Sequence, residues 1–178
     1  GVKYQPQDMA AFYTASIFQI EKQNLLVNDL SNPRRARQIG EVEIKGIELE
    51  AQTVVGQVEL LANYSWLDTE SDTGFRLETV PDHLVSAWAT WRPEGEWQGV
   101  KAGLGLRYVG KTWDGVDQIS TDPYLLADAM LGYETEDWSL TLNLRNLTDE
   151  IHLTACLARG DCFYGDRRSV ALNLTSRF

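Results

Sequence analysis

Long apolar runs are absent from this sequence of 178 residues, and so is an excess of basic residues. The longest unbroken apolar stretch, Met9 to Tyr13, has five residues, whereas a helix that crosses a bilayer needs about 20. The 16 Lys and Arg residues are outnumbered by 26 Asp and Glu residues, which gives a net charge of −10. Nucleic-acid binding requires clustered basic residues that neutralise phosphates, so we expect no nucleic-acid partner.

The sequence also lacks a secretory leader at its start and a set of metal-ligating residues. The opening GVKYQPQDMA contains neither the basic start nor the apolar core of a signal peptide. The only cysteines are Cys156 and Cys162, and the only histidines are His83 and His152. One His and two Cys at this spacing match no strong zinc pattern, so we expect no metal site and no protein-bound cofactor. Composition alone would describe a soluble acidic domain.

Strict alternation of apolar and polar residues is what the sequence does contain, and this period indicates β-strands with one apolar face. From Val100 to Tyr108, alternate positions carry Val, Ala, Leu, Leu and Tyr, and the positions between carry Lys, Gly, Gly and Arg. No segment has a convincing helical stripe, so the predicted fold class is all-β. The nine predicted strands, the first only a stub, cover residues 1–4, 12–23, 38–53, 58–67, 84–92, 100–108, 124–134, 138–145 and 170–178.

The connections between these strands alternate in length without exception. The short ones are 5–10, 54–57, 93–98 and 134–137, and the long ones are 24–37, 68–82, 110–122 and 149–166. Outer-membrane barrels have short periplasmic turns at one end and longer extracellular loops at the other. A soluble sandwich with Greek-key connections has no reason to keep that rhythm. We therefore expect an antiparallel up-and-down transmembrane β-barrel segment.

Aromatic residues near the strand ends support the membrane interpretation, because amphipathic rings favour the two bilayer interfaces. The turn ends of the strands carry Trp91, Tyr133, Trp138 and Phe178, and the loop ends carry Tyr64, Trp66 and Tyr108. Between these belts the outward positions are mostly Leu, Val and Ala. We predict that these seven aromatic residues lie at the membrane interfaces. A sandwich whose aromatic residues happen to lie near strand ends is the alternative.

A series of motifs runs through the whole chain in a fixed order. It consists of GVKYQP, SIFQIEKQNLL, EVEIKGIELEAQ, ANYSWLDTE, VPDHLVSAWATW, LGLRYVGKTWD, PYLLADAMLGYE and WSLTLNLRNLTDEIHLTACLARGDCFYGDRRSV. This series is similar to the C-terminal part of TonB-dependent siderophore receptors, the ferrichrome-receptor type in particular. The ending DRRSVALNLTSRF, with its C-terminal Phe, resembles the terminal strand of outer-membrane barrels.

The resemblance implies a bacterial outer-membrane barrel of 22 strands with a plug domain in its lumen, which takes up ferric siderophores with energy from TonB. Residues 1–178 would be the C-terminal portion of that barrel, with the plug, the TonB box and the N-terminal strands absent. The implied partners are a ferric siderophore, the TonB complex through the missing N-terminal region, outer-membrane lipid and the barrel assembly machinery. Iron would arrive only inside the siderophore.

Cys156 and Cys162 fall in the long loop before the last strand. Outside the cell a disulfide is the natural interpretation, because oxidising conditions prevail there. The family that the chain resembles has a Cys pair at this place and spacing, which strengthens the prediction. The bridge would stiffen a small loop and limit the entropy lost when a ligand is held.

Ligand-binding residues are expected in the extracellular loops, where aromatic rings and hydrogen-bond donors suit a bulky siderophore. The candidates are Trp113, Tyr124, Phe163 and Tyr164, and loop packing or interface anchoring is the alternative for each. In ferrichrome-type receptors an aromatic residue just after the first loop Cys can touch the ligand. Leu157 stands at that position and is the fifth candidate, although its lack of an aromatic ring argues against ferrichrome itself. A basic run, Arg34, Arg35 and Arg37, could bind an anion or be a solvated loop face.

The polar residues that alternate with the apolar ones along each strand would face the lumen of the barrel. There we expect their side chains to bond with one another and with the plug. These residues include Glu48, Glu50, Asn63, Arg107, Asn143 and Arg145. Enzyme signatures are absent, so we expect no catalysis. Two other functions stay open: a passive porin-like channel, and a soluble β-sandwich binding module that buries Leu104, Leu142 and Leu172 between two sheets.

Overall fold

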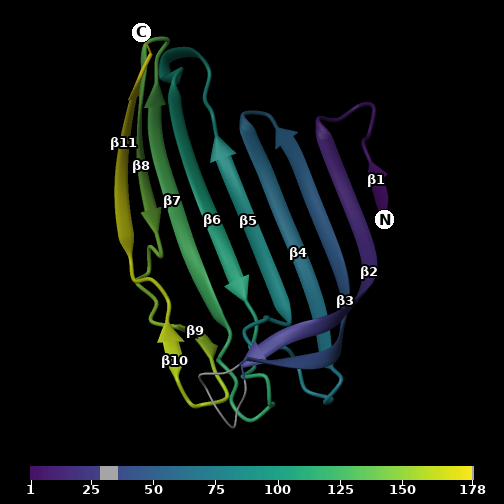
Figure 1. Ribbon diagram of the computed structural model, residues 1–178. Coiled ribbons are helices and arrows are strands. Elements are labelled where there is room, and N and C mark those ends of the chain that lie inside the picture. Colours follow the sequence, from purple (N-terminus) through teal and green to yellow (C-terminus); the bar gives the residue numbers. More distant parts are fainter. Residues whose placement is uncertain (29–35, 178) are drawn as a thin grey trace.

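The computed structural model describes residues 1–28 and 36–177 and contains one nine-stranded antiparallel sheet and one small hairpin (Figure 1). The strands of the sheet are β1 (Val2–Tyr4), β2 (Ala11–Asn28), β3 (Ala36–Val55), β4 (Val58–Ser71), β5 (His83–Trp91), β6 (Val100–Val109), β7 (Tyr124–Glu134), β8 (Trp138–Arg145) and β11 (Ser169–Ser176). Each strand pairs with its neighbours in the sequence, and β11 pairs with β8. The all-β, up-and-down prediction is therefore confirmed.

The strand boundaries differ from the predicted ones mainly at the loop end of the sheet. Strand β2 extends to Asn28 and β4 to Ser71, beyond the ranges 12–23 and 58–67 that the alternation predicted. The last loop contains an unpredicted hairpin, β9 (Leu153–Cys156) and β10 (Cys162–Tyr164). A short 3-10 turn, η1 (Gly95–Trp97), lies in the connection between β5 and β6. In Figure 1 the short turns lie at the upper end of the sheet and the long loops at the lower end.

The two faces of the sheet differ in polarity from the turn-end half of β4 to β11. Cross-strand register places Leu60, Ala89, Leu104, Ala129, Leu144 and Val170 side by side on one face, called here the outer face. Leu104 is 66% exposed and Leu172 67%. The β-sandwich alternative required both to be buried between two sheets, so that alternative is wrong. The opposite face, called the inner face, carries Asn63 and Arg107.

In β2, β3 and β4 the apolar parity changes face part of the way along each strand. Ile17, Ile47 and Trp66 lie in one cross-strand row on the outer face. Towards the turns the outer face remains apolar. Towards the loops its next two rows consist of Gln19, Lys45 and Asp68, and then of Glu21, Glu43 and Glu70. The apolar side chains pass there to the inner face, which carries Phe18, Ile20, Val42, Ile44 and Leu67.

This change of face explains why the alternation predicted the loop end of β4 poorly, because the predicted range 58–67 ends next to Trp66. A search for one continuous apolar parity stops where the apolar residues switch sides, although the ladder continues. Val42, beyond the switch, is only 1% exposed. The row at Ile17, Ile47 and Trp66 therefore marks the end of the apolar band, and the longer strands extend beyond it.

Aromatic rings on the outer face lie towards both ends of the strands. Trp91, Tyr133 and Trp138 are at the turn end, where the rings of Tyr133 and Trp138 are 5.7 Å apart. The loop-side rings are those of Tyr64, Trp66 and Tyr108. Phe178, which was predicted to belong to the turn-end group, is outside the described residues. Tyr4 and Tyr13, with ring centroids 6.4 Å apart, add to the turn-end group and were missed by the sequence analysis. Contact of these rings with the membrane interfaces stays a prediction.

Large inner-face rings occupy the space that glycines leave on neighbouring strands. A Cβ atom at Gly105 would lie 2.1 Å from the Trp88 ring, and one at Gly46 would lie 2.3 Å from the Phe18 ring. The Trp88 indole N–H donates to the Thr90 hydroxyl at 2.9 Å. These glycines are therefore required for packing.

Polar inner-face side chains bond to their neighbours, as expected. Arg107 donates two hydrogen bonds to Asp128, at 2.6 and 3.1 Å. The Asn63 amide donates to Ser86 at 3.3 Å.

Candidate functional site

The long connections 72–82, 110–123 and 146–168 all leave the sheet at the same end (Figure 1). They contain the ligand-binding residues that the sequence analysis proposed, apart from Tyr124, which begins β7. Of the predicted basic run, Arg34 and Arg35 are outside the described residues, and so is the side chain of Arg37. Two separate arrangements emerge, one around Trp113 and one in the last loop.

Trp113 joins the loop 110–123 to the loop 72–82. It forms an isolated bridge with Glu78, and its carbonyl accepts the Thr79 N–H at 3.0 Å. The Arg76 guanidinium carbon lies 4.4 Å from the centroid of the Trp113 ring, within the range of a cation–π contact. Arg76 also forms an ion pair with Asp117 at 3.8 Å. Trp113 thus has a fixed place between two loops.

Asp114 sets the path of the chain just after Trp113. The residue is 1% exposed, and its carboxylate accepts the backbone N–H groups of Val116, Gln118 and Ile119 at 3.0 to 3.2 Å. Such side-chain bonds to the backbone hold a tight turn without help from a ligand. The adjacent Thr112 and Thr121 hydroxyls bond to each other at 2.9 Å and close the base of the loop. This loop is organised before any ligand arrives.

A cavity of about 230 Å³ lies beside Trp113 at the loop end of β4. Leu67 and Thr69 of β4 contribute to its lining, and Arg76, Asp82 and Lys111 come from the loops. Sequence analysis singled out Trp113 but missed the charged residues around it. Their proximity depends on backbone pairing between two loops, which no periodic signal in the sequence reveals.

The last loop contains the disulfide-bonded hairpin β9–β10. Cys156 and Cys162 are opposite each other in its register and are bonded, as predicted. The Leu157 N–H donates to the Asp161 carbonyl at 2.8 Å and closes the turn. Phe163 is 47% exposed and Tyr164 75%. The hairpin therefore presents two aromatic rings on a covalently closed support.

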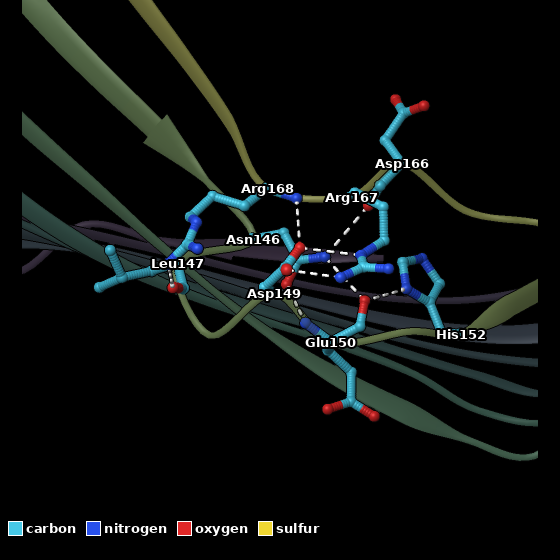
Figure 2. Close-up of polar contacts among 8 residues, drawn as sticks. All are labelled: Asn146, Leu147, Asp149, Glu150, His152, Asp166, Arg167 and Arg168. Atoms are coloured by element: carbon cyan, nitrogen blue, oxygen red, sulfur yellow. Dashed lines mark hydrogen bonds and ion pairs between the residues drawn. The ribbon is translucent and has the colours of Figure 1, made fainter.

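The base of the last loop is fastened by the buried side chain of Asn146 (Figure 2). Its amide nitrogen donates to the carbonyls of Glu150 and Asp166, at 2.9 and 3.1 Å, and its oxygen accepts the Glu150 N–H at 2.8 Å. The backbone N–H of Asn146 donates to Asp128 of β7 at 2.9 Å. Because Asp128 also accepts from Arg107, one polar network links the inner face to both ends of this loop.

Asp149 makes a second connection across the same loop base (Figure 2). Arg167 donates to both carboxylate oxygens, at 2.9 and 2.5 Å, and the Arg168 backbone N–H donates at 2.9 Å. The hydrogen bonds and charge of Arg167 hold the pKa of Asp149 well below its usual range. Sequence analysis missed both Asn146 and Asp149.

Tyr124 packs against the last loop. Its ring lies 4.1 Å from that of His152, measured between centroids, and His152 is 8% exposed. This contact is the loop packing that was considered as the alternative for Tyr124, and a ligand-binding role for the residue stays a prediction. Leu157 is half-buried in the hairpin turn. No ring contact joins Trp113 to Phe163 or Tyr164 within residues 1–28 and 36–177, so the structure does not unite the candidates into one site.

No group of three or more His, Cys, Asp and Glu side chains among the described residues is arranged to hold a metal ion. Likewise, this part of the chain contains no helix with the length and apolarity needed to cross a membrane.

Comparisons with known proteins agree on one family. The family model "TonB dependent receptor-like, beta-barrel" matches residues 1–147. The ferrichrome outer membrane transporter/phage receptor of Escherichia coli K12 is 29% identical, covering 100% of this chain and 26% of the relative. The ferrioxamine B receptor of Salmonella typhimurium is 31% identical, covering 100% and 27%. Thus the chain spans about a quarter of the length of the curated relatives it matches.

A solved structure gives the same fold. The ferric yersiniabactin uptake receptor of Yersinia pestis superimposes with a TM-score of 0.80 at 19% identity, covering 97% of this chain and 28% of that chain. The likeness at this identity concerns the fold. Together with the family match over 147 of the 178 residues, it identifies the chain as a member of the TonB-dependent receptor-like β-barrel family of the bacterial outer membrane.

Proposed function

We propose that this chain supplies the C-terminal barrel wall and several extracellular loops of an outer-membrane receptor that takes up ferric siderophores. The observation that carries the proposal is the family match over residues 1–147. Relatives that align with the whole chain include a ferrichrome transporter and a ferrioxamine B receptor. The ligand would bind at the loop end, where Trp113, Phe163 and Tyr164 lie, and iron would travel as cargo inside the siderophore.

Residues 1–178 are, in this proposal, one portion of a larger barrel. The open edges of the sheet support it: β1 covers only residues 13–15 of β2, and β11 pairs with β8 on one side only. Unpaired edges favour the addition of further strands. Those strands, the plug and the TonB box would belong to the rest of the receptor, through which the TonB complex acts. Outer-membrane lipid and the assembly machinery complete the proposed partners, and no catalytic step is involved.

Uptake of radioactive iron tests this function. The complete receptor is expressed in iron-starved cells that lack their own siderophore receptors, and uptake from a panel of ferric siderophores is measured. We expect saturable uptake of at least one complex, abolished when TonB is deleted. Uptake that persists without TonB and rises linearly with concentration would instead identify a passive channel.

A further inference from the structure

The cavity beside Trp113 is too small for a complete siderophore complex. Its volume is about 230 Å³, whereas pockets that enclose a small molecule have roughly 300–1,000 Å³. A liquid water molecule takes roughly 30 Å³, so the cavity has room for several waters or for one side arm of a larger ligand.

Asp82 is part of the lining of this cavity and has one carboxylate oxygen without a hydrogen-bond partner among the described residues. This atom, Oδ1, is buried. The backbone of Asp82 is fixed on both sides, because its carbonyl accepts the Leu67 N–H at 3.0 Å and its N–H donates to the Lys111 carbonyl at 3.1 Å. A Cβ atom at Gly110 would lie 2.1 Å from Oδ1, so only glycine leaves room for the carboxylate. A buried acceptor held without a partner favours a ligand that donates to it.

The remaining lining selects the chemistry of that ligand group. Asp82 disfavours a carboxylate arm, because the two like charges would repel each other. Arg76 is engaged by Asp117 and by the Trp113 ring, and Lys111 is exposed, so its flexible stem can carry the ammonium into solvent. What remains is an indole wall beside an acceptor. An aliphatic arm that ends in an N–H group matches this pair, since its stem packs on the ring and its head reaches the carboxylate.

We propose that this cavity binds an N–H-bearing side arm of the ferric siderophore, with Asp82 as the acceptor and Trp113 as the apolar wall. The inference rests on the proposed function and adds a chemical requirement to it. The iron centre itself stays outside the cavity, in the mouth of the barrel. Asp82 is thus a specificity-determining residue that distinguishes complexes with such an arm from complexes without one.

Titration of the complete receptor in detergent with three ferric trihydroxamates tests the inference. One is linear and ends in a primary ammonium, the second is the same chelator after N-acetylation, and the third is cyclic and has no arm. A charge-assisted hydrogen bond predicts that the wild type binds the ammonium-bearing complex about tenfold or more tightly than the cyclic one. Asp82→Asn should remove this preference. Asp122→Asn, which changes an exposed carboxylate in the neighbouring loop 110–123, should preserve it.

The outcomes separate the inference from the function on which it rests. If the acetylated complex behaves like the ammonium complex, the recognised group is the N–H; if it behaves like the cyclic one, the recognised group is the charged ammonium. Equal affinity of the wild type for the ammonium-bearing and cyclic complexes overturns the inference. A preference for the ammonium-bearing complex that survives Asp82→Asn overturns it as well. A receptor that binds only a ferric catecholate overturns it too but leaves the proposed function standing. Absence of binding to any ferric complex overturns the function.

Discussion

Single residues on the inner face show how close packing can depend on the lack of a side chain. Alternation in the sequence predicts that Gly103 and Gly105 lie on this face, but it gives no reason for two glycines there. The Trp88 ring supplies that reason, because it covers both backbone positions from the neighbouring strand. The partner is 17 residues away in the sequence for Gly105, and only the register of β5 and β6 brings the two together.

Gly105→Ala should destabilise the folded barrel by displacing Trp88. The added Cβ would lie 2.1 Å from the ring, and overpacking of this kind typically costs about 1–3 kcal/mol. The free energy of unfolding in detergent, measured by urea titration, checks the value. In a Trp88→Ala background the same substitution should cost much less; an equal cost in both backgrounds would show that the ring is not the cause.

Asn146 illustrates a buried polar residue whose role is invisible to a pattern search. It has φ of +50°, a conformation that Asn tolerates better than most residues, and its side chain is almost fully buried. Asn146→Gly keeps the backbone conformation accessible but removes three amide hydrogen bonds. Removal of bonded buried groups predicts a loss of about 1–3 kcal/mol in unfolding free energy. Leu147→Ala, which changes an exposed residue at the start of the same loop, serves as the control and should change the unfolding free energy much less.

At the scale of elements, the period of two predicted the strands and the alternating connections, because both follow from the pleat and from burial on one face. It did not predict the β9–β10 hairpin, which is too short to show a period. Nor did it predict the change of apolar face in β2, β3 and β4, because two opposite parities in one strand weaken each other's signal. The charged cavity residues were missed for a third reason: Arg76, Asp82 and Lys111 meet through loop pairing.

The change of face predicts where the outer surface leaves the membrane. Ile47 and Lys45 are two positions apart on the same side of β3 but on opposite sides of the predicted boundary. Single cysteines introduced as Ile47→Cys and Lys45→Cys should differ in their reaction with a membrane-impermeant maleimide in lipid vesicles, with only the second labelled rapidly. Detergent-denatured samples, in which both react, provide the control. Equal rapid labelling of both in vesicles would place the boundary closer to the turns.

The base of the last loop should depend on pH through Asp149. Arg167 lowers the pKa of this carboxyl group in the folded state. Its contribution is therefore complete above the ordinary Asp pKa of about 3.9 and is lost as the pH falls through the lower folded-state value. Hydrogen exchange of residues 150–166, corrected for intrinsic rates, should remain protected at pH 5 and increase only in strong acid. Asp149→Asn should exchange faster at pH 5, whereas Asp161→Asn, which removes the ion pair with Arg159 inside the hairpin turn, should leave the loop base protected.

At the scale of the whole molecule, the nine strands form a sheet whose two edge strands have unpaired backbone N–H and C=O groups and whose outer face is largely apolar. Detergent or lipid covers the face, but it cannot supply the backbone hydrogen bonds that an open edge lacks. Among the described residues, β11 has no partner on the side away from β8, and β2 has none on the side away from β3 except at residues 13–15, which pair with β1. The resemblance to a 22-stranded barrel family led to the same picture, because only nine strands were predicted in residues 1–178.

Residues 1–178 refolded alone in detergent should therefore associate through their edges. Sedimentation velocity is expected to show assemblies that grow with protein concentration, while the complete receptor stays monomeric under the same conditions. The apolar face is equally covered by detergent in both samples, so any difference between them reports the edges. A monomer that persists at all concentrations, with native-like β-structure by circular dichroism, would mean that the edges are protected by the chain itself, and the argument from open edges to a larger barrel would lose its support.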